Sequence, residues 1–211
     1  MEDYVKIGEA LRLVERYEDY LFRRAMGISF IVNGLVFPTI VLLALNAGRL
    51  SDFFNINPDV FIPLASGTVL LGGISVIIYV FTSAHVMSSR LRHRSLWSNA
   101  SHMIIMFSLW FLSFFVTGYA PPPYEVVSWL WAGSFASMFT YAFNRFTSKD
   151  WNYPELLIVG AILLLSSIPV LGMGNTETAN IVAVAVLAVS FFTAGLYSFN
   201  AAQRILKDSG K

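Results

Sequence analysis

Residues 155–173 read ELLIVGAILLLSSIPVLGM, a run in which the first side chain is the only charged one. A helix that crosses the hydrocarbon core of a bilayer needs ~20 predominantly apolar residues, so this run alone predicts a membrane span. Five further stretches of similar length and composition occur in the chain. The six predicted spans cover residues 25–47, 60–84, 100–119, 125–143, 155–173 and 178–200.

The overall composition is that of a membrane protein. Of the 211 residues, 56% are hydrophobic and 13% are charged, and this charged fraction is about half that of a soluble domain. The net charge of +1 gives no reason to expect a nucleic-acid partner. The absence of cysteine excludes disulfides, thiolate metal sites and thiol nucleophiles. We therefore expect an all-α integral membrane protein, a bundle of six transmembrane helices that occupies residues 25–200.

The basic residues are segregated to one side of the predicted bundle. Every Lys and Arg except Arg49 falls near the N-terminus, in the connection after the second or the fourth span, or near the C-terminus. The positive-inside rule places such residues on the cytoplasmic side of the membrane. Both termini, including a tail of residues 201–211, are therefore expected in the cytoplasm of a multi-pass cell-membrane protein.

The residues that precede the first span have the pattern of an amphipathic helix. Apolar side chains recur at spacings of three and four in residues 4–24, and charges of both signs fill the other face. Helices that lie on a membrane usually have a basic polar face, so the balanced charge favours contact with protein. Residues 1–24 are expected to be a cytoplasmic helix that packs on the chain's own inner surface, on a second copy, or on a cytosolic subunit. The apolar stripe consists of Ile7, Ala10, Val14, Tyr17 and Leu21.

The inner connection between the second and third spans carries Arg90, Arg92 and Arg94 and is flanked by His85 and His102. The arginines suffice to orient the protein, and they are also suited to bind lipid phosphates or a partner. His85 and His102 lie at similar depth and could face each other as haem ligands. Their spacing matches no ligand motif and no carboxylate lies nearby, so no cofactor is expected. Membrane lipids are the expected partners of this surface.

Two predicted spans contain polar, bendable segments. In the first span Pro38 cannot donate a hydrogen bond to the carbonyl of Gly34, and Asn33 can bond backbone groups that the kink frees. The second span has a similar segment rich in glycine and hydroxyl groups. If a solute passes, we expect it between these segments, although the kink could serve packing alone. The candidate path consists of Asn33, Gly34, Pro38, Ser66, Gly67, Thr68, Gly72 and Gly73.

Small residues form a stripe along the fourth span and another along the sixth. Such stripes let helix backbones approach closely, either within one bundle or between the chains of a homo-oligomer or hetero-complex. They could also line a polar path. The two stripes consist of Ser128, Ala132, Ala136 and Thr140, and of Ser190, Ala194, Ser198 and Ala202.

Several functional classes are disfavoured by what the spans lack. No ionisable side chain lies in the middle of a span, which argues against ion-coupled transporters and proton pumps. The sequence contains no His-Glu-x-x-His motif and no paired carboxylates, and the Ser66-Gly67 pair has no histidine at membrane depth. An enzyme is therefore not expected.

The layout resembles that of the six-span permeases of export-type ABC transporters, which begin with an inner amphipathic helix and couple through the inner connection after the second span. The resemblance implies a cytosolic subunit docked at residues 4–24 and 85–99. We therefore expect a transport-type protein, either a permease subunit or a passive channel for a small solute. The alternatives are a non-transporting assembly or scaffold subunit and, third, a haem-binding redox subunit.

Overall fold

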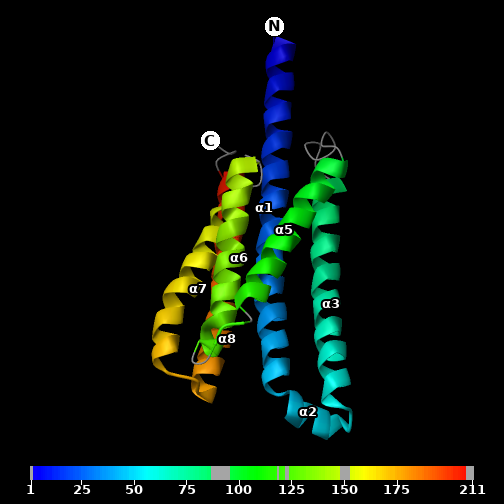
Figure 1. The fold of residues 1–211 in the computed structure, drawn as a ribbon. Coiled ribbons are helices and arrows are strands. Elements are labelled where there is room, and N and C mark those ends of the chain that lie inside the picture. The colour runs from blue at the N-terminus through cyan, green and yellow to red at the C-terminus, as the bar shows by residue number, and fades with distance from the viewer. Residues whose placement is uncertain (1, 87–95, 118, 122–123, 148–152, 208–211) are drawn as a thin grey trace.

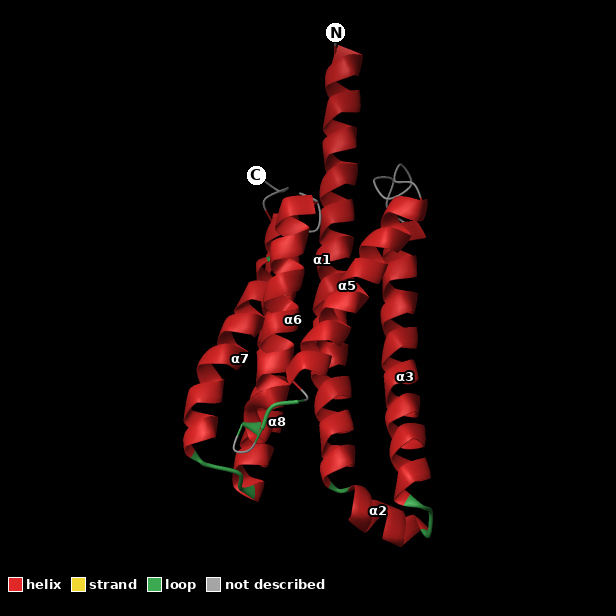
Figure 2. Ribbon diagram, in the orientation of Figure 1, coloured by secondary structure: helices red, strands yellow, loops and turns green. Residues whose placement is uncertain are grey.

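Every described element of the computed structural model is an α-helix, and the long helices run side by side (Figure 1). Short connections are confined to the two ends of the bundle (Figure 2). The structure describes residues 2–86, 96–117, 119–121, 124–147 and 153–207. The helices are α1 (Glu2–Leu45), α2 (Ala47–Phe54), α3 (Pro58–Val86), α5 (Leu96–Thr117), α6 (Glu125–Thr147), α7 (Pro154–Gly172) and α8 (Glu177–Lys207).

Four helices in the described part of the chain are long and apolar enough to cross a membrane. They are the Ala10–Leu45 part of α1, the Pro58–Val80 part of α3, α7 and α8. α5 has a shorter apolar run, and α6 carries hydroxyl, amide and charged side chains that lower its mean hydropathy. The chain is built as a multi-pass membrane protein, while passage of α5 and α6 through the bilayer stays a prediction.

Local sequence explains where two of the long helices begin. The side-chain oxygen of Asn57 accepts a hydrogen bond from the backbone N–H of Asp59 at 2.9 Å, just before Pro58 opens α3. The hydroxyl of Thr176 likewise accepts from the backbone N–H of Ala179 at 3.1 Å, at the start of α8. These side chains satisfy N–H groups that a helix start leaves without a partner.

The buried core lies where α1, α6, α7 and α8 meet. α1 packs along α8 on one side and along α3 on another, and α6 packs against α7 and α5. α3 lies at the edge of the bundle, because only 11% of its apolar segment is buried, against 44% for α8. The centre of the core includes Phe30, Val127, Leu130, Val159, Leu163, Leu187, Phe191 and Ala194.

Glycines set the closest approaches between these helices. A Cβ on Gly195 of α8 would lie 3.0 Å from the carbonyl oxygen of Gly27 and 2.8 Å from Cγ1 of Ile31, both on α1. Between α6 and α7, the hydroxyl of Ser134 donates to the carbonyl oxygen of Gly160 at 2.8 Å. In a bilayer no hydrophobic driving force acts between helices, so close packing and hydrogen bonds of this kind hold the helices together.

α1 differs from the sequence expectation because it is one continuous helix of 44 residues. The predicted amphipathic segment 1–24 and the first span were expected as separate elements, yet no break divides them. The N-terminal part of α1 extends past the ends of the other helices (Figure 1). Ile7, Val14 and Tyr17 are 56%, 52% and 47% exposed, so this part of the stripe does not pack across the chain's own inner surface, whereas Leu21 is partly buried.

The sequence pattern did not predict α2, an eight-residue helix that connects α1 to α3. It lies across the end of the bundle opposite the N-terminus (Figure 1). Its length is well below that of a span, so a search for apolar runs passes over it.

Candidate functional site

The two predicted polar segments, one in α1 and one in α3, lie next to each other. A Cβ on Gly73 would overlap Cγ2 of Val36, so α3 approaches α1 closely at this point. Ser66 lies two turns earlier on the same side of α3, and its hydroxyl oxygen is buried. Asn33 is half-buried one turn before Val36. The seam between α1 and α3 is therefore closely packed at Gly73.

Pro38 does not interrupt α1, which continues to Leu45, and its ring is buried. The neighbouring hydroxyl of Thr39 donates to a carbonyl one turn earlier in α1 at 2.6 Å. Gly34 contacts α8, where a Cβ on it would lie 3.0 Å from Cβ of Phe191. The missing side chain of Gly34 thus serves the contact between α1 and α8, in addition to any room it gives the proline ring.

Other residues of the predicted path do not join the seam. Thr68 and Gly72 are exposed, and open space surrounds the Cβ positions of Gly67 and Gly72. The hydroxyl of Thr68 donates to a carbonyl of its own helix at 2.8 Å. Thr68 lies about 140° around the helix from Gly73, so the two cannot face the same neighbour. The eight predicted residues therefore do not line one continuous path.

The small-residue stripes are buried inside the chain, except for the half-exposed Ser128. The other seven residues are at most 1% exposed. Two of them bridge helices: the indole N–H of Trp110 donates to the hydroxyl of Thr140 at 3.1 Å, and the hydroxyl of Ser198 donates to the carbonyl of Arg23 at 2.9 Å. Because these faces are occupied within one chain, a contact between chains through them, as the sequence suggested, would require the bundle to open.

A buried ion pair joins α1 to the start of α7. The guanidinium of Arg23 donates to Oε1 of Glu155, whose side chain is fully buried, while the Arg23 side chain is 24% exposed. The guanidinium carbon of Arg23 lies 5.0 Å from the centre of the Tyr153 ring. The Phe22 ring stacks on the same Tyr153 ring, with 5.5 Å between the ring centres. With Ser198 bonded to the backbone of Arg23, the cluster fixes α1 to both α7 and α8.

Sequence reasoning missed this ion pair. Glu155 and Arg23 were both at predicted span boundaries on the cytoplasmic side, and opposite charges at one depth were the available signal. The search for ionisable groups covered only the middle of each span. The pair lies at the end of the bundle that carries the N-terminus, so it does not place a charge at mid-membrane depth.

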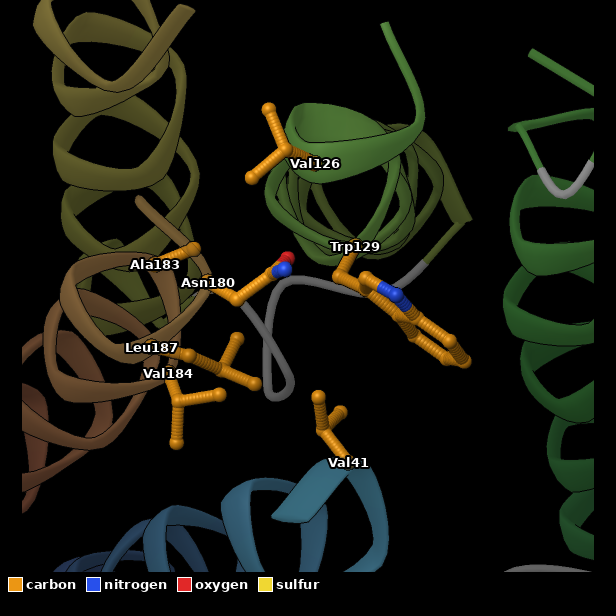
Figure 3. A pocket seen from close by; sticks show the side chains of 7 residues that line it. All are labelled: Val41, Val126, Trp129, Asn180, Ala183, Val184 and Leu187. Atoms are coloured by element: carbon orange, nitrogen blue, oxygen red, sulfur yellow. The ribbon is translucent and has the colours of Figure 1, made fainter. Parts of the chain in front are cut away.

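A small cleft lies at the opposite end, where α1, α6 and α8 meet (Figure 3). Its cavity volume is about 10 Å³, which is room for roughly one water molecule. Pockets that hold drug-sized ligands are usually ~300–1,000 Å³, so this cleft is too small for such a substrate. Asn180 supplies its amide, among side chains that are otherwise mostly apolar. The lining residues are Val41, Val126, Trp129, Asn180, Ala183, Val184 and Leu187.

Some predicted site residues lie outside the described part of the structure. Arg90, Arg92 and Arg94 belong to the undescribed residues 87–95, so their proposed contact with lipid or a partner is not placed. His85 and His102 lie in α3 and α5, but their side chains are outside the described set. Among the residues that the structure does describe, no three His, Asp or Glu side chains are grouped to hold a metal ion.

No protein family model matches the chain, and no curated protein and no solved structure is detectably similar to it. Its own geometry is thus the basis for assigning it a role.

Proposed function

We propose that this protein is the membrane subunit of a complex and that the protruding part of α1 docks a cytosolic partner. The observation that carries the proposal is the continuous α1 helix with an exposed apolar stripe. At 1.5 Å per residue, its 44 residues extend about 66 Å, roughly twice the ~30 Å thickness of the hydrocarbon core. Residues 25–45 match that core, so the preceding half of α1 projects from the membrane.

The proposed docking segment comprises residues 7–17 of α1. Ile7, Val14 and Tyr17 lie along one face and are about half exposed, while Arg12 lies on the opposite face. Charged side chains of both signs keep this segment soluble in water, whereas the apolar stripe gains free energy when a partner covers it. The ion pair between Arg23 and Glu155 holds α1 to the bundle just before the segment enters the membrane.

In this proposal six helices, α1, α3, α5, α6, α7 and α8, cross the membrane and both termini are cytoplasmic. The start of α1, the end of α3, the start of α5 and the end of α8 lie at the same end of the bundle (Figure 1). Among the described residues, every Lys and Arg other than Arg49 lies in a helix segment toward that end, as the positive-inside rule requires of the cytoplasmic side. α5 and α6 run alongside the four helices that are apolar enough to cross, which supports their crossing as well.

The test is purification from native membranes in mild detergent, followed by mass spectrometry of the associated proteins. Val14→Gln and Tyr17→Gln should each lose the partner several-fold, whereas Arg12→Gln on the opposite face should retain it. Retention of the partner by all three variants, or recovery of the unaltered chain alone, would contradict docking at this segment. An ATPase among the partners would identify a permease subunit, and other membrane proteins alone would identify an assembly subunit. A visible spectrum of the same sample tests for haem.

A second candidate function is a passive channel along the seam between α1 and α3. Its support is polar: Asn33 is half-buried in α1 and the hydroxyl oxygen of Ser66 is buried on the side of α3 that meets α1. The close packing of Gly73 on Val36 means that α1 and α3 would have to separate for a solute to pass. Solute flux into liposomes that contain the purified chain measures it. Asn33→Leu should lower the flux, with Leu35→Ala on the exposed side of α1 as the control, and equal flux in both would contradict the path.

A further inference from the structure

α2 is held in a defined position between α1 and α3. Its C-terminal residue is followed by Asn55, which adopts the left-handed conformation with φ 53° and ψ 42°. The backbone N–H of Ile56 then donates to the carbonyl of Ser51 at 3.0 Å, which closes the turn. Ser51 is only 1% exposed, so this side of α2 rests against the rest of the molecule. The short helix is therefore a fixed part of the fold.

The aromatic residues of α2 are left uncovered. Phe53 is 81% exposed, Phe54 is 54% exposed, and Ile56 just beyond the helix is 39% exposed. The Phe53 and Phe54 rings meet edge to face at 5.1 Å between centroids, and Phe54 stacks on Phe61 of α3 at 5.7 Å. These contacts fix the rings in place without removing them from the surroundings.

Polar and apolar side chains are separated around α2. Leu50, Phe53 and Phe54 share one helical face, Asp52 lies on the opposite face, and Arg49 lies between Asp52 and Phe53. A short helix with aromatic and leucine side chains on one side and charges on the other is suited to the boundary between lipid head groups and acyl chains.

We propose that α2 is an interfacial anchor whose Phe53, Phe54 and Ile56 side chains insert into a lipid surface. The depth of α2 supports this occupant, because the apolar part of α1 ends at Leu45 and that of α3 begins at Pro58. α2 joins these two boundaries and so lies at the edge of the hydrocarbon core. Its apolar surface continues onto exposed residues of the adjoining spans: Leu42, Leu45, Val60 and Leu64.

The anchor rests on the passage of α1 and α3 through the membrane and not on the partner proposed for the other end of α1. Failure of either proposal therefore leaves the other intact. An anchor at this position would fix the depth of the hairpin that α1 and α3 form, because α3 lies at the edge of the bundle and packs mainly on α1.

The absence of cysteine allows a direct test with single nitroxide labels. Phe53→Cys, Ile56→Cys and the matched control Asp52→Cys are labelled in the full chain and reconstituted into phosphatidylcholine vesicles. Electron paramagnetic resonance then compares the accessibility of each label to oxygen, which concentrates in lipid, and to a water-soluble nickel chelate.

The ratio of oxygen to nickel accessibility should be several-fold higher at positions 53 and 56 than at position 52. Equal ratios, with all labels open to the nickel chelate, would show that the side chains face water and would overturn the proposal. Low accessibility of positions 53 and 56 to both reagents would show that protein covers them and would overturn it as well. Two labelled positions guard against a local effect of one substitution.

Discussion

The two side chains of the Arg23–Glu155 ion pair differ in burial, so replacing one or the other should lower the stability of the protein by different amounts. Arg23→Met removes the cation and leaves the carboxylate of Glu155 in a fully buried position. Removing one partner of a buried pair costs about 3–5 kcal/mol, because the remaining charge is uncompensated. Glu155→Gln leaves the guanidinium, which at 24% exposure still reaches water, so we expect the loss of one charged hydrogen bond, about 1.5–3 kcal/mol.

The assay is unfolding in mixed micelles, with helical circular dichroism followed as sodium dodecyl sulfate is titrated against a mild detergent. Arg23→Met should unfold at a lower mole fraction of dodecyl sulfate than Glu155→Gln. The double variant should lose less than the sum of the two, since it no longer contains the buried carboxylate, with a coupling free energy of about 1–3 kcal/mol. Arg24→Met, at an exposed neighbouring position, is the control and should change stability by no more than about 0.5 kcal/mol.

Equal losses for Arg23→Met and Glu155→Gln, or strictly additive losses in the double variant, would refute the reasoning. Either result would mean that Glu155 reaches water or another cation when Arg23 is removed.

Three further measurements test the packing and the orientation. Gly195→Leu should destabilise the protein by at least about 1–3 kcal/mol because its side chain overlaps α1, whereas Gly72→Leu, which meets open space, should be near neutral; similar effects would contradict the close contact. Trp110→Phe keeps the aromatic packing but loses the indole hydrogen bond to α6, and should cost about 1 kcal/mol in the same unfolding assay. A membrane-impermeant maleimide applied to intact cells should label Asp59→Cys but reach Lys207→Cys only after permeabilisation, and the reverse pattern would invert the proposed orientation.

The positions of the long helices could be predicted from the sequence, but not their full lengths. The predicted span 178–200 lies inside α8, which runs on to Lys207. Hydropathy detects the apolar part of a helix but does not detect the polar turns by which the helix continues. The same limit hid the continuity of α1, since residues 22–26 contain no glycine or proline to separate the amphipathic part from the span.

The candidate site was less accessible to prediction, for two physical reasons. The periodicity of α3 already separates Thr68 from Gly73 by about 140°, so their assignment to different faces could have been made in advance. The pairing of Arg23 with Glu155 could not, because the two are 132 positions apart and only the packing of α1 and α7 against α8 brings them together. The short helix α2 was missed because eight residues are too few for an apolar run to stand out.

The unbroken course of α1 gives it the mechanical properties of a lever. Arg23 is its fulcrum, and about 32 Å of helix lies on the N-terminal side and about 33 Å on the side that ends at Leu45. With arms so nearly equal, a sideways push on the N-terminal arm moves Leu45 by a similar distance in the opposite sense as long as the helix stays straight. The closest contact of α1 with α8 lies about one turn beyond Arg23, at Gly27 and Gly195, where Ile31 and Phe199 pack beside the glycines. A force applied to the protruding end of α1 would then be felt at the other end of the bundle, directly beside α2.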